Sequence, residues 1–199
     1  MGRRVYFSFH YQDVIDFRAN VVRNSSKFRN KGTDFRDASI WEEAKEKQVD
    51  KIKNLISSEL RGTSVCVVLI GSETYNRRWV RYEIIKSFEL KKGLLGVGIN
   101  WIKGKDGKRK LLPGENPFDY LKIKLSKDGK EIFFFESNGW KWMPYRDLKS
   151  IPNKNHLDKK YAGKEFKLSG LYKRYSYDWN SGNHNLDKWI ETAAKQANR

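Results

Sequence analysis

The stretch Ser64-Val-Cys-Val-Val-Leu-Ile-Gly-Ser-Glu-Thr-Tyr-Asn-Arg-Arg-Trp-Val-Arg-Tyr-Glu83 decides the fold of this chain. It begins with a short apolar, β-branched run, which predicts a strand that is buried on both faces. A Gly-Ser turn follows, and the spacing then becomes helical, so that Trp79 and Glu83 lie on one face of a helix. Ligands of open α/β sheets bind at the carboxyl ends of such strands. The stretch therefore predicts a carboxylate and an indole beside a ligand site.

The composition is that of a folded, strongly basic protein. The 199 residues suffice for one domain, or for one domain with a large appendage. Hydrophobic residues make up 38% of the chain and aromatic residues 14%, which is enough for a sizeable core although 33% of the residues are charged. The formal net charge of +17 attracts polyanions such as nucleic acid, nucleotides or anionic lipid headgroups.

The single cysteine and the hydropathy pattern indicate the compartment. Cys66 lies within the apolar run, so the sequence excludes an internal disulfide and a cysteine metal cluster, and we expect a buried, inert thiol. The N-terminal residues lack the apolar segment of a signal peptide, and no stretch reaches the ~20 apolar residues of a membrane span. We therefore expect a soluble, cytoplasmic protein that makes no membrane contact.

Strand and helix patterns alternate through the first hundred residues. This alternation indicates an α/β fold in which a central parallel sheet, with flavodoxin-like connections, is flanked by helices on both faces. The expected strands are residues 4–9, 38–41, 65–70 and 94–99, and the expected helices are residues 10–24, 42–60 and 79–92.

The remainder of the chain has a different pattern. Residues 130–136 and 140–145 predict an antiparallel hairpin around an Asn-Gly turn, and residues 186–197 predict an amphipathic helix. We divide the chain into an α/β core, residues 1–110, and an α+β C-terminal elaboration, residues 111–199. Because the second part is rich in aromatic residues, we expect it to pack on the core as one cooperative unit.

Several kinds of catalytic site are excluded. The chain contains no phosphate-binding loop, no dinucleotide-binding glycine motif after the first strand and no nucleophile elbow. Its histidines, His10, His156 and His184, are too scattered for a zinc site. The first strand ends in Ser-Phe-His rather than in an acidic pair, which excludes a receiver-type phosphoacceptor site. We expect neither a metal ion nor a bound cofactor.

Polar and aromatic residues remain at the ends of three expected strands. Their position at one edge of a parallel sheet makes them the candidate site. They are Ser8, Phe9 and His10 after the first strand, Asp37 and Trp41 near the second, and Ser72, Trp79 and Glu83 after the third.

These residues lie in motifs that resemble those of TIR domains, and more narrowly those of the bacterial TIR proteins of the Thoeris anti-phage system. The motifs are Phe7-Ser-Phe-His-Tyr11, an Asp before the second strand, and Leu69-Ile-Gly-Ser-Glu-Thr-Tyr75 followed by Arg78-Trp-Val-Arg-Tyr-Glu83. The resemblance covers roughly residues 4–100, and the C-terminal third is also similar to the Thoeris subgroup.

The resemblance implies an enzyme that uses NAD as its substrate. It implies cleavage of the bond between nicotinamide and ribose, closure of the ADP-ribose into a cyclic signal after phage infection, and a separate effector that the cyclic nucleotide activates. Homo-oligomers are also expected. Carried over by motif, Glu83 stabilises the positive charge that develops on the ribose, and the substrate-binding residues are Ser8, Phe9, His10, Asp37, Ser72 and Trp79.

Each residue also has a structural interpretation, and two other functions stay open. Taken alone, Glu83 is a solvated helix carboxylate, Trp79 packs in the core, and His10 caps a loop. A non-catalytic TIR adaptor would act only through homotypic contacts. A basic nucleic-acid-binding module would explain the net charge, but the sequence contains neither a recognition helix nor a ribonucleoprotein-type aromatic motif.

Overall fold

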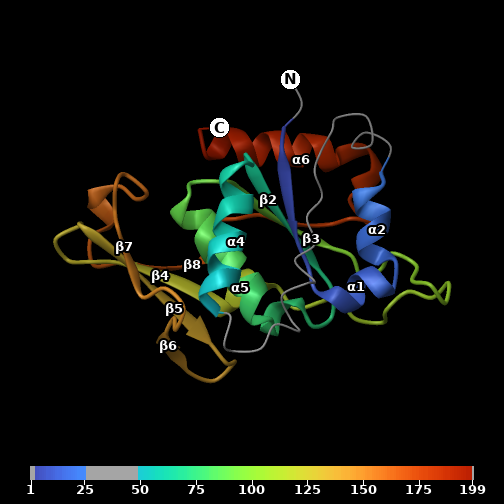
Figure 1. Cartoon of the computed structure of the whole chain (residues 1–199), viewed down its shortest axis with the longest axis horizontal. Coiled ribbons are helices and arrows are strands. Elements are labelled where there is room, and N and C mark those ends of the chain that lie inside the picture. The colour runs from blue at the N-terminus through green and yellow to red at the C-terminus, as the bar shows by residue number, and fades with distance from the viewer. Residues whose placement is uncertain (1–2, 26–48, 199) are drawn as a thin grey trace.

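A computed structural model describes residues 3–25 and 49–198 of the chain (Figure 1). Its centre is a sheet of four parallel strands in the order β1-β2-β3-β9. The bounds are Val5–Ser8 for β1, Val65–Ile70 for β2, Gly93–Gly98 for β3 and Arg174–Ser176 for β9. Every residue of β2 is fully buried, as the apolar run predicts for a central strand.

Helices cover both faces of this sheet (Figure 1). The side chains of α4 (Val49–Arg61) and α5 (Arg78–Glu89) pack on one face, in a cluster with Tyr6 and Val68. On the other face, α2 (Arg18–Arg23) and α6 (Gly182–Gln196) pack on the alternate residues of the same strands. Since successive strand residues point to opposite faces, one short strand serves two cores. The expected α/β class with a central parallel sheet is confirmed.

A second, antiparallel sheet lies beside the first (Figure 1). Its strand order is β6-β5-β4-β8, and β7 also pairs with β5. The predicted hairpin is confirmed as the β5–β6 pair. The bounds are Leu121–Leu125 for β4, Glu131–Ser137 for β5, Trp142–Pro144 for β6, Ser150–Pro152 for β7 and Glu165–Lys167 for β8. Short 3-10 turns lie at η3 (Thr74–Asn76), η4 (Pro117–Tyr120), η5 (Lys159–Tyr161) and η6 (Leu168–Gly170).

Helix α5 lies between the two sheets and packs against both. The ring of Phe88 on α5 meets the ring of Phe134 on β5 edge-on, with 5.8 Å between the centroids. Arg81 on the same helix forms an ion pair of 3.1 Å with Glu136 on β5. The inner face of the second sheet thus shares one apolar cluster with the first sheet. Cooperative unfolding of the two parts stays a prediction.

The predicted helix over residues 10–24 is wrong. The segment forms two short helices, α1 (Tyr11–Ile15) and α2, which are separated at Phe17. Phe17 has a φ of 64°, in the left-handed region that ends a right-handed helix. The apolar spacing of the segment did not reveal this break.

Other boundaries differ by a few residues. The helix expected at 79–92 ends at Glu89, because Lys91 has a φ of 51° and turns the chain into β3. The C-terminal helix begins at Gly182 rather than at residue 186. The expected strand 38–41 and the first part of the expected helix 42–60 lie outside the described residues.

Two further findings concern burial and hydropathy. Cys66 is fully buried, as expected, and burial raises the pKa of its thiol. Within residues 3–25 and 49–198, no helix has the length and apolar character needed to cross a membrane.

Candidate functional site

The carboxylate of Glu83 lies between α5 and β1 and is held at both oxygens. The Tyr6 hydroxyl donates to Oε1 over 2.5 Å, and the Ser8 hydroxyl donates to Oε2 over 2.5 Å. Glu83 is fully buried. Buried carboxylates are costly unless hydrogen bonds compensate the lost hydration, and these two hydroxyls supply such bonds.

The alternation of β1 explains why these two hydroxyls meet Glu83. Tyr6 and Ser8 are two residues apart, so both point to the face that α5 covers. Burial, and then the neighbouring Glu83 carboxylate, raise the pKa of the Tyr6 hydroxyl well above its usual range. Tyr6 therefore keeps its proton and remains a donor. Sequence reasoning missed Tyr6, although its spacing from Ser8 was the signal that could have identified it.

Trp79 lies one helical turn before Glu83, but it is largely enclosed. Its indole is 7% exposed and meets Tyr82 edge-on at 6.1 Å between the ring centroids. The guanidinium of Arg78 lies over the indole at 4.7 Å from the ring centroid. These contacts hold the first turn of α5, and Glu83 extends toward β1 from the following turn.

Phe9 points away from Glu83. It is 2% exposed and belongs to the cluster under α2 and α6, where the Arg23 guanidinium lies 5.7 Å from its ring centroid. The structure therefore does not bring Phe9 together with Glu83. Asp37 and Trp41 lie outside the described residues. The substrate-binding roles of Phe9 and Asp37 stay predictions.

A cavity of about 530 Å³ lies at the carboxyl edge of the parallel sheet. Its wall begins at His10, two residues beyond Ser8, and continues at Ser72 after β2, so two of the expected residues line it. Its volume is within the ordinary range of small-molecule sites. The remaining lining residues are largely charged: Gln12, Asp13, Ile15, Asp16, Glu73, Lys105, Asp106 and Lys110.

Asp13 is a buried acid in this wall that sequence reasoning missed. Burial raises the pKa of its carboxyl group from 3.8 to about 6, although the nearby His10 ring and the Thr74 hydroxyl favour the ionised form. Thr74 Oγ1 donates to Asp13 Oδ2 over 3.3 Å and accepts from the amide of Gly71 over 2.9 Å. A side chain at Gly71 would collide with the Asp13 carboxylate. The position of Asp13, three residues after His10 at the start of a helix, was the available signal.

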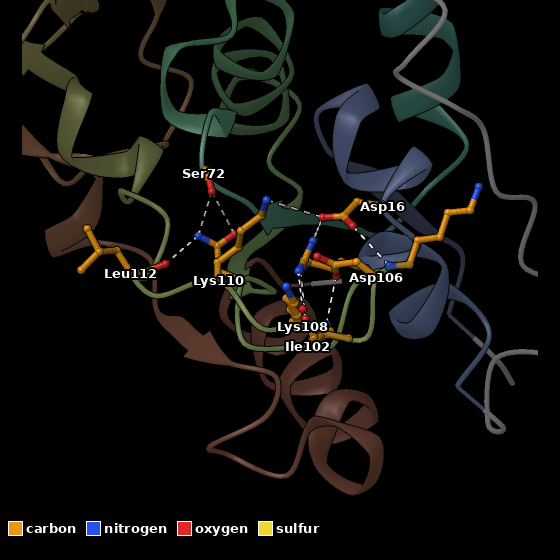
Figure 2. Close-up of polar contacts among 10 residues, drawn as sticks. Asp16, Ser72, Ile102, Asp106, Lys108, Lys110 and Leu112 are labelled. Carbon is orange, nitrogen blue, oxygen red and sulfur yellow. Dashed lines mark hydrogen bonds and ion pairs between the residues drawn. The ribbon is translucent and has the colours of Figure 1, made fainter.

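The loop after β3, residues 99–112, contributes Lys105, Asp106 and Lys110 to the cavity wall. Figure 2 shows the polar contacts of this loop. Asn100 donates to the Ser72 hydroxyl over 3.1 Å and to the carbonyl oxygen of Leu112 over 2.8 Å. The Lys110 ammonium reaches Asp16 at 3.9 Å, and Asp16 also pairs with Arg18 (Figure 2). These contacts tie the loop to α1 and to the end of β2.

Arg18 also holds this loop in place. It is 2% exposed, and its guanidinium donates to the carbonyl oxygens of Ile102 over 2.9 Å and Lys108 over 2.8 Å (Figure 2). Charge-assisted hydrogen bonds of this kind are about twice as strong as neutral ones, which makes the loop a firm wall. Among the described residues, no group of three or more His, Cys, Asp or Glu side chains could hold a metal ion.

The site thus consists of two neighbouring parts on one edge of the sheet. The first is the buried Glu83 carboxylate with Tyr6 and Ser8, and the second is the cavity lined by His10 and Ser72. A carboxylate in the first part can stabilise a cation, and the mixed charges of the second suit a polar ligand that bears both phosphates and hydroxyls.

Comparison with known proteins gives two matches. Residues 6–103 match the family model described as Thoeris protein ThsB, TIR-like domain. A protein of Bacillus cereus (strain MSX-D12), named "Putative cyclic ADP-D-ribose synthase ThsB1", is 45% identical over 192 residues, which are 96% of this chain and 100% of the relative. The similarity therefore extends beyond the parallel sheet into the second sheet and α6.

Proposed function

Because this chain belongs to the ThsB family of Thoeris TIR-like proteins, we propose that it cleaves NAD and closes the ADP-ribose into a cyclic ADP-ribose-type signal. The observation that carries the proposal is the buried carboxylate of Glu83, held by two hydroxyls of β1 in a chain that is 45% identical over nearly its whole length to a protein with that printed name.

The chemistry needs a fixed anion more than a strong acid. Nicotinamide in NAD is a cationic leaving group, so the bond to ribose breaks with its electron pair going to the ring nitrogen. The ribose carbon left behind carries positive charge, as in glycoside hydrolysis. A preorganised carboxylate stabilises this charge, and Tyr6 and Ser8 hold Glu83 in place for that task.

Cyclisation requires that a nucleophilic nitrogen or oxygen of the same molecule reaches the ribose carbon before water does. The cavity of about 530 Å³ beside His10 and Ser72 has room to hold the rest of a folded dinucleotide. Lys105 and Lys110 in its wall suit the pyrophosphate, and Asp13 and Asp16 suit ribose hydroxyls. We assign the substrate to this cavity.

Access to Glu83 sets a condition on this proposal. Glu83 is fully buried and is not among the residues that line the cavity. The segment from Ser8, which contacts Glu83, to His10, which lines the cavity, joins the two parts, and we expect it to rearrange before the ribose reaches the carboxylate. We therefore expect low activity in the resting protein and higher activity after an infection trigger. The product then acts on a separate effector in the cytoplasm.

Replacing Glu83 by Gln tests the proposal. The substitution keeps the size of the side chain and removes its charge, and we expect a loss of cyclic product of about 10²-fold or more. The product is measured by mass spectrometry of small molecules from phage-infected cells, and folding is checked by circular dichroism. Glu131→Gln, at an exposed position of β5 outside the substrate cavity, is the matched control. A folded Glu83→Gln protein that forms product at the wild-type rate would refute the assignment.

A further inference from the structure

On the outward face of the second sheet, lysines of β4 lie beside aromatic rings of β5. On β4, Lys122 and Lys124 point outward, and in the register of the sheet they lie opposite Phe135 and Phe133 of β5. All four side chains are partly exposed, whereas Ile123 and its inward neighbours are buried. This face is therefore a surface rather than a packed layer within the described residues.

One lysine lies against two rings of this face. The Lys122 ammonium is 5.2 Å from the ring centroid of Phe135 and 4.9 Å from that of Trp142 on β6. Lys167 on β8 lies 5.9 Å from the same Trp142 ring. These cation–π contacts show that the rings accept positively charged groups on a flexible stem, which can move aside when a flat ligand stacks.

The charge of the face is mainly positive. Lys122 and Lys124 share one carboxylate, that of Glu165, at 2.6 and 3.1 Å, and Lys141 and Lys167 are exposed to solvent. The whole chain carries a net charge of +17. An anionic partner therefore meets a favourable field at this face.

A cavity of about 500 Å³ continues the face toward the first sheet. Trp142 and Lys167 form part of its wall, together with Arg174 of β9 and the hydroxyl of Ser137. It thus combines the rings of Trp142 and Tyr120, two cations and the carboxylates of Glu115 and Asp119 within one concave site. Such a site can take one base with its phosphate, while the rings of Phe133 and Phe135 take neighbouring bases.

We propose that this face, defined by Phe133, Phe135, Trp142 and the lysines 122, 124 and 167, binds single-stranded nucleic acid. Bases stack on aromatic rings whatever their sequence, and lysines along the path neutralise the phosphates. A duplex hides its bases and cannot use the rings, so the aromatic component favours a single strand. The chain has no ribonucleoprotein sequence motif; the face is assembled from side chains of β4, β5, β6 and β8.

Fluorescence anisotropy with labelled oligo-dT and oligo-rU of about ten nucleotides tests the proposal on the full chain. We expect binding that Trp142→Ala weakens by about 5- to 100-fold, in keeping with the loss of one stacked base. Trp179→Ala is the matched control, since Trp179 is 73% exposed and contacts Trp101 on a different surface. This control is expected to bind like the wild type.

A salt titration separates stacking from charge. Lys167→Gln is expected to reduce the slope of log affinity against log salt by about 0.7, the value for one phosphate contact on a single strand. Three results would overturn the proposal: no binding at low salt, equal binding by wild type and a folded Trp142→Ala protein, or tighter binding to duplex than to single strand. The test does not depend on the enzymatic proposal, because it measures no turnover.

Discussion

At the scale of single residues, the cavity wall contains an acid whose protonation is coupled to folding. Asp13 is 8% exposed, and burial raises the pKa of its carboxyl group to about 6. In the unfolded chain the same group has the ordinary value of 3.8. The protonated Asp13 carboxyl group therefore stabilises the folded state fully at pH values below the unfolded-state pKa of 3.8. This contribution is lost as pH rises through about 6, because the unfolded state releases the proton at a lower pH than the folded state does.

We expect Asp13→Asn to remove this pH dependence. A shift of about two pKa units corresponds to about 3 kcal/mol, so the wild type should lose up to that amount relative to Asp13→Asn as pH rises from about 4 to about 7. Urea unfolding of both proteins across this range measures the difference. Stability curves that run parallel would show that Asp13 titrates normally in the folded state.

At the scale of elements, the contact between β3 and α6 depends on a glycine. A Cβ on Gly93 would lie 2.7 Å from backbone atoms of Ala193, which no side-chain movement can relieve. The C-terminal helix therefore approaches the sheet as closely as it does only because the first residue of β3 lacks a side chain. The apolar cluster between this helix and the sheet includes Trp189, whose ring stacks on that of Tyr175 at 4.3 Å between the centroids.

Gly93→Ala is expected to lower the free energy of unfolding by about 1–3 kcal/mol, the usual cost of overpacking. Gly62→Ala serves as the matched control, because its Cβ would meet nothing closer than 3.7 Å. The control should leave stability unchanged or raise it by about 0.4–1 kcal/mol through the unfolded state. Chemical denaturation of the wild type and the two variants measures their free energies of unfolding. Equal effects of the two substitutions would contradict the argument from the close contact at Gly93.

At the scale of the whole molecule, residues on both sides of position 110 build the same cores. Strand β9 completes the parallel sheet, α6 covers one face of it, and the second sheet shares an apolar cluster with α5 on the other. The apolar surface of the first hundred residues is therefore covered in part by elements that follow position 110.

We expect the full chain to unfold in one transition. Val67→Ala in β2 and Phe134→Leu in β5 each remove buried apolar contacts worth about 1–3 kcal/mol, and each should shift that single transition. Calorimetry, with circular dichroism and tryptophan fluorescence as independent probes, measures it. Separate midpoints for the two probes would contradict the prediction, as would a soluble, cooperatively folded fragment that ends at Asn100.

The local sequence pattern was sufficient to predict the strands, helices and turns that have the most distinctive sequences. The apolar run of β2, the helical spacing from Trp79 to Glu83 and the Asn-Gly turn of the hairpin could be recognised because each depends on neighbours in the chain. The same motifs carried the family resemblance, which the comparisons confirm. The break at Phe17 was missed because a left-handed backbone at a bulky residue leaves no compositional signal.

Only the tertiary structure decided which side chains meet. Tyr6 and Ser8 find Glu83 across 75 or more positions of sequence, and Phe9, although adjacent to Ser8, points to the opposite core. Strand β9, with the polar residues Arg-Tyr-Ser, joins the sheet because β3 offers it an unpaired edge. The physical reason is common to all of these: hydrogen bonds and packing depend on positions in space, whereas a linear pattern records only the local period of burial.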